Sequence, residues 1–336
     1  MKIGRITILQ TIVFVFLSTL AVCGNALVLY CISQNTRMQT VTGMFLVSLA
    51  VTDLGVGLIS LPVSLVSAYN PILLSNKWFC DLNGTSMMLF LLSSLLTLGS
   101  ISLQKYICVG FNKRTSFNKK TAKRCIAAIW VVSAGLSLAP VLGWSKYGTS
   151  KDGHQCGPFA WDIPGRIYSA CILVIGFIIP ITVMSYCYKS LYRKMREHNE
   201  RMRANAVISP SLPSVQNQDN RRANRLEIRM IYTFMVIGIV FLCCWLPSGV
   251  LVILEFAQVE EPLEYELFAL ALAYGNSTLN PIIYAYRHQE FRRGFKSVLL
   301  MGVPKCCRRK VSDSSNEFER QAYVFGNNNA RIPVTV

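Results

Sequence analysis

The stretch ILQTIVFVFLSTLAVCGNALVLYCI, at residues 8–32, contains no charged side chain and is long enough to cross a bilayer, which takes about 20 apolar residues. Six more apolar runs of similar length follow, at residues 42–67, 82–109, 125–142, 167–188, 231–254 and 267–286. Spanning strands would be about 10 residues long with alternating polarity. Only helices satisfy the backbone in lipid over continuous runs of this length. The sequence therefore predicts an all-α integral membrane protein, a bundle of seven transmembrane helices.

The composition favours the same class. The chain is 52% hydrophobic and 15% charged, with a mean hydropathy of +0.39, whereas soluble domains carry about 25% charged residues. A signal peptide is the competing interpretation of the first run, because Lys2 and Arg5 precede it. That run is too long for such a peptide, and Gly24 and Asn25 lie inside it with no loop after them. We therefore expect a first span preceded by a short extracellular N-terminus at residues 1–7.

The distribution of charge predicts the orientation of the chain in the membrane. The net charge is +17, but the basic residues lie between spans rather than on one soluble face, which argues against nucleic-acid binding. They follow the third, fifth and seventh spans, whereas the segment between the sixth and seventh is acidic. By the positive-inside rule the N-terminus is outside and the C-terminus cytoplasmic. We expect a multi-pass protein of the plasma membrane.

The cysteines divide into three groups. Cys80 and Cys156 are both expected on the outer side, where an oxidising exterior permits a bridge between them. Cys306 and Cys307 follow an amphipathic, basic segment inside the cell, and are either palmitoylation sites or free cytosolic thiols. The remaining cysteines lie in or near spans and are interpreted as packing residues.

The segments outside the spans are expected to be simple. Residues 8–287 would form the transmembrane domain, with an amphipathic helix at residues 288–299 on the inner membrane surface and a disordered cytoplasmic tail at residues 300–336. Residues 201–220 contain Pro210 and Pro213 among Ser, Asn and Gln and read as a flexible loop. The histidines are scattered, and the sequence shows no metal-ligand cluster.

Asp53 is the carboxylate in the middle of a span, within the stretch LAVTDL at residues 49–54. A bare carboxylate in lipid is costly, so it must face the bundle interior and find partners. Ser94, Asn276 and Asn280 could join it in a sodium site, since these oxygens suit a hard cation. The alternative is a protonated aspartic acid that shares hydrogen bonds with asparagines. A sodium ion is thus the one cofactor we expect, and no covalent cofactor.

Prolines mark three of the spans. Pro180 lies in the fifth span, Pro247 follows Cys244-Trp245-Leu246 in the sixth, and Pro281 follows Asn280 in the seventh. Proline inside a spanning helix frees a carbonyl and bends the helix. These are places where the helices can flex.

The whole set of motifs resembles the rhodopsin-like family of G-protein-coupled receptors. It comprises Gly24-Asn25, Leu-Ala-x-x-Asp ending at Asp53, Cys80, Trp130, Pro180 with Tyr188, Cys-Trp-Leu-Pro and Asn-Pro-x-x-Tyr ending at Tyr284. The resemblance covers about residues 8–299. It implies a pocket open to the outside, coupling to a heterotrimeric G protein, contacts with membrane lipid, and arrestin and kinases acting on the tail. The implied switch residues are Gln104, Lys105, Tyr106, Tyr188, Glu227, Phe241, Trp245, Pro247, Asn280, Pro281 and Tyr284.

The chain departs from this family at the inner end of the third span. Members carry Asp-Arg-Tyr or Glu-Arg-Tyr there, whereas this sequence reads Gln104-Lys105-Tyr106. Lysine keeps the positive charge but lacks the planar fork of arginine. Glu227 is placed to pair with Lys105, as a weak single contact. We expect weak coupling with measurable basal activity.

A second departure concerns the ligand. Stretches such as PVLGWS at residues 140–145 resemble visual opsins, but Tyr274 stands where an opsin has its retinal-binding lysine. Amine receptors have an aspartate where this chain has Met87. The implied pocket is apolar, with Ser248 and Tyr274 as its polar side chains, and suits a lipophilic or weakly polar small molecule. Its members would be Met87, Met88, Leu91, Ile172, Gly176, Trp245, Ser248, Gly249, Leu270 and Tyr274, unless these residues only pack the core.

Other functions fit the sequence less well. A transporter would show paired discontinuous helices and internal repeats, and a membrane enzyme would need clustered acids or histidines at membrane depth, where Asp53 stands alone. We therefore expect a receptor that is not an enzyme. A constitutively active or non-coupling receptor is the alternative, and a transporter is a more remote one.

Overall fold

The structure is a computed structural model of the 336-residue chain. It describes residues 2–70, 72–110, 117–149, 156–158, 163–208, 215–256, 259 and 262–301. Within these ranges the side chains of residues 2–5, 109–110, 195, 198–199, 201–208, 215–230, 252, 255–256 and 299–301 lie outside the description. The chain divides into two compact units, Met1–His288 and Gln289–Val336.

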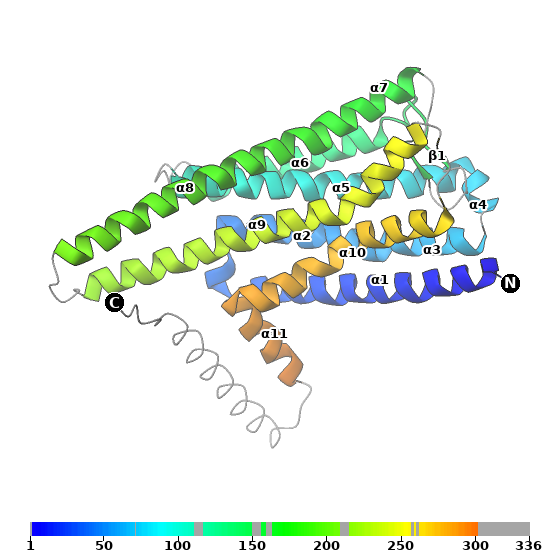
Figure 1. Cartoon of the computed structure of the whole chain (residues 1–336). Helices are drawn as coiled ribbons and strands as arrows, with labels where there is room; N and C mark the ends of the chain where they lie inside the picture. Colours follow the sequence, from blue (N-terminus) through cyan, green and yellow to red (C-terminus); the bar gives the residue numbers. More distant parts are fainter. Residues whose placement is uncertain are drawn as a thin grey trace, which may run out of the picture. The chain divides into compact units, whose positions relative to one another are not determined.

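The first unit is a bundle of seven spans (Figure 1). The first, fourth, sixth and seventh spans are single helices: α1 (Lys2–Gln34), α6 (Lys119–Leu138), α9 (Val215–Phe256) and α10 (Leu263–Arg287). The other three contain π-helical turns: α2 (Val41–Gly55), η2 (Val56–Ser60) and α3 (Leu61–Tyr69); α5 (Lys77–Lys105) and η3 (Tyr106–Gly110); and α7 (Ile163–Cys171), η4 (Ile172–Ile178) and α8 (Ile179–Ile208). Short helices η1 (Thr36–Met38) and α4 (Ile72–Ser75) join the early spans.

The helices match the apolar runs of the sequence, and this confirms the predicted helical membrane bundle. Among the described residues, six helical segments are long and apolar enough to cross a membrane: Ile6–Gln34, Val41–Tyr69, Lys77–Cys108, Lys119–Leu138, Ile163–Lys194 and Ile231–Leu251. The seventh span, α10, is a helix of 25 residues. It carries Glu264 and Glu266 in its first turn and buried asparagines further along, and these polar residues lower its hydropathy.

Side-chain caps and prolines explain where helices start and bend. Thr40 caps α2 by accepting a hydrogen bond from the Gly43 N–H at 3.1 Å, and Asn118 caps α6 by accepting from the Thr121 N–H at 3.0 Å. The π-helical segment η4 ends at Ile178, two residues before Pro180, which cannot donate a backbone hydrogen bond. Pro247 and Pro281 lie inside α9 and α10. The prolines thus lie in the fifth, sixth and seventh spans, where the sequence predicts bends.

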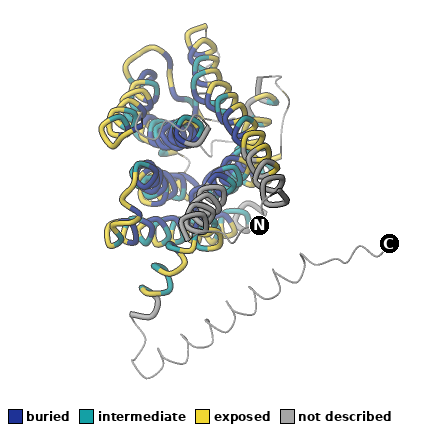
Figure 2. The backbone as a smooth tube through the Cα atoms, turned by 90° about the vertical axis from the view of Figure 1, so that its left-hand side faces the viewer, coloured by how far each residue is buried: buried dark blue, intermediate teal, exposed yellow. Residues whose placement is uncertain are grey.

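The core lies between the helices, and the apolar surface faces outward. Figure 2 shows the buried parts of the backbone turned toward the inside of the bundle and the exposed parts on its outside. Large apolar side chains such as those of Ile12, Leu58 and Ile253 are exposed, as expected for helices surrounded by lipid. Gly24 lets α1 approach α10, because a Cβ there would lie 2.9 Å from the Pro281 ring.

One end of the bundle carries a short hairpin, and we call it the hairpin end. Strand β1 (Gly148–Thr149) pairs antiparallel with β2 (Cys156–Gly157) beside the start of α5. Cys156 is bonded to Cys80 with the two Cα atoms 5.3 Å apart, which confirms the predicted disulfide. The N-terminus and α4 lie at this same end (Figure 1).

A tyrosine fixes the hairpin to the helices. The Tyr147 hydroxyl donates to the Ser137 carbonyl at the end of α6 at 2.7 Å. Its ring lies on Gly84 of α5, where a Cβ would be only 2.4 Å from Tyr147 Cδ1. Burial raises the pKa of Tyr147 far above its usual range, so the phenol remains a neutral donor. The glycine is therefore required for the close approach of this ring.

Three segments differ from the sequence predictions. Helix α1 begins at Lys2, so that residues 2–7, expected to form a tail, continue the first span. Helix α8 continues to Ile208 and α9 begins at Val215, so most of the loop expected at residues 201–220 is helical. The end of α8 is rich in Arg, Lys, Glu, Met and Ala, which favour helix. In the second unit, the helix expected at residues 288–299 is α11 and has the bounds Gln289–Met301. Within it, the centroids of the Phe291 and Phe295 rings are 6.0 Å apart.

Candidate functional site

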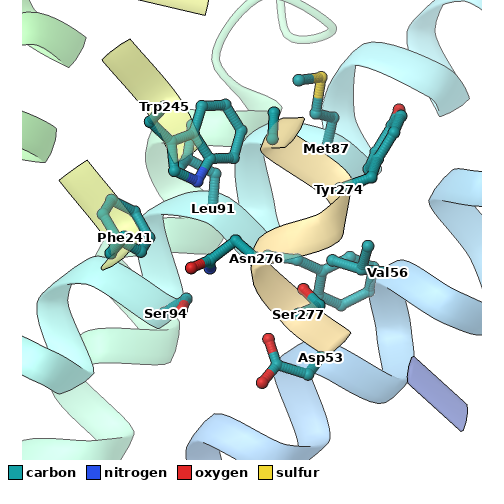
Figure 3. A pocket seen from close by; sticks show the side chains of 12 residues that line it. Asp53, Val56, Met87, Leu91, Ser94, Phe241, Trp245, Tyr274, Asn276 and Ser277 are labelled. Atoms are coloured by element: carbon teal, nitrogen blue, oxygen red, sulfur yellow. The ribbon is translucent and has the colours of Figure 1, made fainter. Parts of the chain in front are cut away.

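A small cavity lies between the second, third, sixth and seventh spans (Figure 3). Its volume is about 20 Å³, which is room for a water molecule or a small ion. One end is formed by the Asp53 carboxylate and the other by Met87 and Tyr274. The lining residues are Asp53, Val56, Met87, Phe90, Leu91, Ser94, Phe241, Trp245, Ala273, Tyr274, Asn276 and Ser277.

The Asp53 end of the cavity gathers oxygen atoms. Asp53 is 1% exposed, and its Oδ2 accepts a hydrogen bond from Asn280 Nδ2 at 2.7 Å. Ser94 Oγ and Asn276 Oδ1 are buried in the same lining and have no hydrogen-bond partner among the described residues. The four residues predicted to hold sodium therefore meet at one place. A carboxylate with unpartnered hydroxyl and amide oxygens fits a hard cation.

No thiol or imidazole joins this group of oxygens. Within the described part of the chain, no group of three or more His, Cys, Asp or Glu side chains could hold a metal ion. Softer metals such as zinc prefer nitrogen and sulfur ligands. The donor set at Asp53 therefore suits sodium in preference to a transition metal.

Trp245 forms the middle of the cavity wall. Its ring stacks on Phe241, one turn earlier on α9, with ring centroids 6.0 Å apart, and Phe177 of η4 meets it edge-on at 6.5 Å. Its Nε1–H is buried without a partner among the described residues. Pro247 follows two residues later inside the same helix. This places an aromatic cluster beside the proline of the sixth span.

The Met87 end of the cavity is largely apolar. Met87, Leu270 and Tyr274 form one buried cluster with Phe14 and Leu61. The Phe14 ring meets the Tyr274 ring edge-on, with centroids 5.8 Å apart. The Tyr274 hydroxyl bonds to Ser64 Oγ at 2.7 Å. Tyr274, which stands at the position of an opsin's lysine, is thus held between an aromatic ring and a neutral hydroxyl.

The structure brings together only part of the predicted ligand pocket. Met87, Leu91, Trp245 and Tyr274 line the cavity, and Leu270 lies in the cluster at its end. Others lie outside it: Met88 is buried on α5, Ile172 and Gly176 are buried on η4, and Ser248 donates to the Ala269 carbonyl at 3.3 Å. Gly249 lies on the exposed side of α9, where an added Cβ would meet nothing within 4 Å.

Sequence reasoning missed a cluster of buried hydroxyls and an amide near Tyr274. Ser64 is fully buried and Asn83 is 1% exposed, and Asn83 Nδ2 donates to Ser64 Oγ at 3.3 Å. Ser60 donates to Ser86 at 3.3 Å beside them. The spacing of Ser60 and Ser64, four residues apart in an apolar span, is a signal that could have indicated a shared polar face. The pocket region is therefore more polar than predicted.

The inner switch residues lie at the end of α5 opposite the hairpin. Gln104 is buried, accepts a hydrogen bond from Thr42 at 3.4 Å and donates to Cys108 Sγ at 3.4 Å. Lys105 is also buried, at 4% exposed. The Tyr106 ring meets the Tyr186 ring edge-on at 5.6 Å. The side chain of Glu227, the predicted partner of Lys105, lies outside the described residues.

The remaining switch residues occupy the interior of the bundle. Tyr188 and Tyr284 are buried, and Pro281 packs against Gly24. Asn25 donates from Nδ2 to the Ser277 carbonyl at 3.0 Å and so ties the first span to the seventh. Cys306 and Cys307, the predicted lipidation sites, lie outside the described residues.

Comparisons with known proteins agree with this arrangement. Residues 24–284 match the family described as "7 transmembrane receptor (rhodopsin family)". "Rhodopsin, GQ-coupled" of Mizuhopecten yessoensis is 28% identical over 87% of this chain and 59% of its own length, so the chain spans about three fifths of that relative. The human histamine H2 receptor is 28% identical over 90% of this chain and 80% of its own length. A crystal structure of squid rhodopsin, 23% identical, shares the fold with a TM-score of 0.75 over 90% of this chain and 87% of that one.

The fold and the buried motifs define a multi-pass helical membrane receptor. The chain belongs to the rhodopsin family of seven-transmembrane receptors, the rhodopsin-like class of G-protein-coupled receptors. The members of this family are receptors and not enzymes. The relatives range from an opsin to an amine receptor, so family membership alone leaves the ligand open.

Proposed function

We infer that the chain is a plasma-membrane receptor that binds an apolar or weakly polar small molecule and activates a heterotrimeric G protein when its sixth span swings outward. The observation that carries this function is the continuous cluster from Met87 and Tyr274 to Trp245 and Phe241. A ligand that displaces Trp245 acts directly on α9, beside the bend at Pro247. A bundle with two arrangements responds to a ligand that prefers one of them.

The hairpin end is the extracellular end in this proposal. The disulfide between Cys80 and Cys156 lies there, and disulfides persist in oxidising surroundings. Lys119, Lys120 and Lys123, in the first turns of α6, are separated from that end by the length of the span. Their position fits a cytoplasmic surface under the positive-inside rule. The N-terminus is then outside and the C-terminus cytoplasmic.

The chemistry around Tyr274 supports a neutral ligand. No carboxylate lines the Met87 end of the described cavity, so a cationic amine would meet no counter-charge there. Tyr274 cannot form the imine that holds retinal in opsins. Methionine is flexible and polarizable, so Met87 can adapt its shape to an apolar ligand.

A sodium ion at Asp53 is the proposed modulator. Asp53, Ser94, Asn276 and Asn280 would hold the ion in the inactive arrangement, and the ion would supply a positive charge to a carboxylate buried in the bundle. Sodium would favour the inactive state by binding it better than the active one.

The cytoplasmic partners follow from the same proposal. The G protein would dock where Lys105 and Tyr106 lie, and arrestin and kinases would act on the tail beyond α11. Phe291 and Phe295 lie together on α11, and Arg292, Arg293 and Lys296 of the same helix would bring positive charge to lipid phosphates. Acylation at Cys306 or Cys307 would add a second membrane signal.

A signalling assay tests the proposed function. Cells that express the chain alone would be assayed for G-protein activation, first without ligand and then with pooled neutral lipophilic compounds. We expect a basal signal that a pool changes, and expect Trp245→Ala to remove that change. A constitutively active receptor would show the basal signal without a response to any pool, and solute flux without G-protein activation would favour the transporter.

A further inference from the structure

A chain of buried hydrogen bonds runs from the cavity to the hairpin. The Tyr274 hydroxyl bonds to Ser64 Oγ at 2.7 Å, Asn83 Nδ2 donates to Ser64 Oγ at 3.3 Å, and the Cys156 N–H donates to Asn83 Oδ1 at 3.4 Å. All four residues are buried, at 3%, 0%, 1% and 0% exposed respectively. The bonds connect α10, α3, α5 and β2 in turn. Each bond therefore crosses between two different elements, over 210, 19 and 73 residues of sequence respectively.

Both ends of this chain are held in place. Cys156 is bonded covalently to Cys80, which lies one helical turn before Asn83 on α5, so β2 is fixed over the Asn83 side chain. At the other end the Phe14 ring packs edge-on against Tyr274. Side chains that are buried and packed at both ends keep their hydrogen-bond geometry.

We propose that Ser64 and Asn83 are positioning residues that hold the Tyr274 phenol at the cavity and connect it to the hairpin. The connection is a hydrogen-bonded relay, which consists of Tyr274, Ser64, Asn83 and Cys156. The amide of Asn83 accepts from the hairpin through its oxygen and donates toward Ser64 through its nitrogen. Hydrogen bonds in such a series polarise one another, so a change at one end alters the next bond. A molecule that moves Tyr274 thereby loosens the hairpin.

The relay contains no charged group, and this limits the kind of change that it can pass from one end to the other. Its donors and acceptors are two hydroxyls, a side-chain amide and a backbone N–H, so it responds to geometry and not to protonation near neutral pH. Two of its bonds are longer than the usual 2.9 Å of N–H···O contacts, so each contributes modestly. The expected coupling is accordingly a small factor and not an on–off switch.

The test measures the hairpin directly. The full chain in lipid nanodiscs, with neither ligand nor G protein, would be followed by hydrogen–deuterium exchange of the peptide that contains Cys156 and Gly157. Asn83→Leu should speed exchange of this peptide by about fivefold, the factor for losing one neutral hydrogen bond. Tyr274→Phe, which removes only an oxygen on another helix, should speed it by about 1.5-fold.

Two controls separate a relay from general loosening. Tyr265→Phe deletes a hydroxyl from the same helix, one that contacts the Pro247 carbonyl at 3.5 Å outside the relay, and should leave the hairpin peptide unchanged. In a Ser64→Ala background, Tyr274→Phe should add nothing, because the bond it removes is already absent.

Three results would overturn the relay: no effect of Tyr274→Phe on the hairpin, an equal effect of Tyr265→Phe, or full additivity of Tyr274→Phe with Ser64→Ala. The proposal rests on the proposed function only in assigning the cavity to a ligand. Because the exchange experiment uses no ligand and no G protein, its failure would leave the signalling assay unaffected, and a silent receptor would leave the relay intact.

Discussion

Asp53 is buried beside neutral amides and hydroxyls, and the hydrogen bond from Asn280 offsets only part of the cost of a carboxylate inside a bundle. The nearby oxygens of Ser94 and Asn276 are buried without partners in the described structure. A cation would satisfy both and neutralise the carboxylate. The residue chemistry therefore makes the sodium proposal testable through stability.

Exchange of sodium for N-methylglucamine at constant ionic strength should lower the melting temperature of the purified chain. Asp53→Asn should abolish this sodium dependence, because a ligand that binds only the folded state stabilises it by an amount that rises with the ratio of its concentration to its Kd. Asp81→Asn is the matched control. Asp81, on α5, is buried like Asp53 but does not line the cavity. An Asp53→Asn protein that kept the full sodium dependence would show that the site is structural.

Gln104 and Lys105 stand where family members carry an acid and an arginine. Lys105→Arg should raise the maximal nucleotide-exchange rate of added G protein, because a flat guanidinium stacks and bonds bidentately where an ammonium does not. Gln104→Asp should lower the basal rate severalfold, since an acid beside the cation restores a contact of the inactive state. Equal maximal rates for Lys105→Arg and the unmodified chain would refute the prediction that Lys105 weakens coupling. The prediction of basal activity would be refuted if the unmodified receptor is silent and Glu227→Ala does not activate it.

At the scale of elements, the contact between α5 and the hairpin depends on a missing side chain. Gly84→Ala should lower the melting temperature by several degrees, because the new Cβ would lie 2.4 Å from the Tyr147 ring and force it off its carbonyl partner. Gly135→Ala is the control on the exposed side of α6, where a Cβ meets nothing within 4 Å. We expect it to be neutral or slightly stabilising. Equal melting temperatures for the two variants would contradict this packing.

Helix α11 supports a prediction about lipid attachment. Labelling of expressing cells with a palmitate analogue should mark the chain, and the double substitution Cys306→Ser and Cys307→Ser should remove the label, since thiols just past a membrane-surface helix are accessible to acylation. Cys243→Ser, which changes an exposed cysteine of α9, should leave the label intact. Label that persists in the double variant would place the acyl chain elsewhere.

The helices and the disulfide show which structural features can be predicted from the sequence. Spans follow from the apolar runs because only helices close their hydrogen bonds in lipid, and the disulfide follows from two cysteines at the same end. The meeting of Ser64, Asn83 and Tyr274 was not foreseen, because it depends on how three helices are rotated about their axes. The helical continuation of α8 past residue 201 was missed because it rests on propensity and pairs such as Arg196–Glu200 at 2.9 Å, not on hydrophobic length. The predicted ligand pocket was carried over from the family, and here Ile172, Ser248 and Gly249 stand apart from the cavity.

Three regions of the bundle act together in the proposed function. The hairpin end holds a disulfide and the relay, the middle holds the cavity between Trp245 and Asp53, and the opposite end holds Gln104 and Lys105. The bend at Pro247 lies next to the cavity wall on α9. A change in the cavity can thus shift the population of bundle arrangements that a G protein recognises.

The most direct test of this account is nucleotide exchange on purified heterotrimeric G proteins by the chain alone in lipid nanodiscs, over a panel of Gα subtypes. We expect exchange above that of empty nanodiscs for at least one subtype. Sodium should lower this exchange, and Lys105→Arg should raise it further. No exchange on any subtype, from either protein and with the Cys80–Cys156 disulfide verified as formed, would contradict the claim that this receptor activates G proteins.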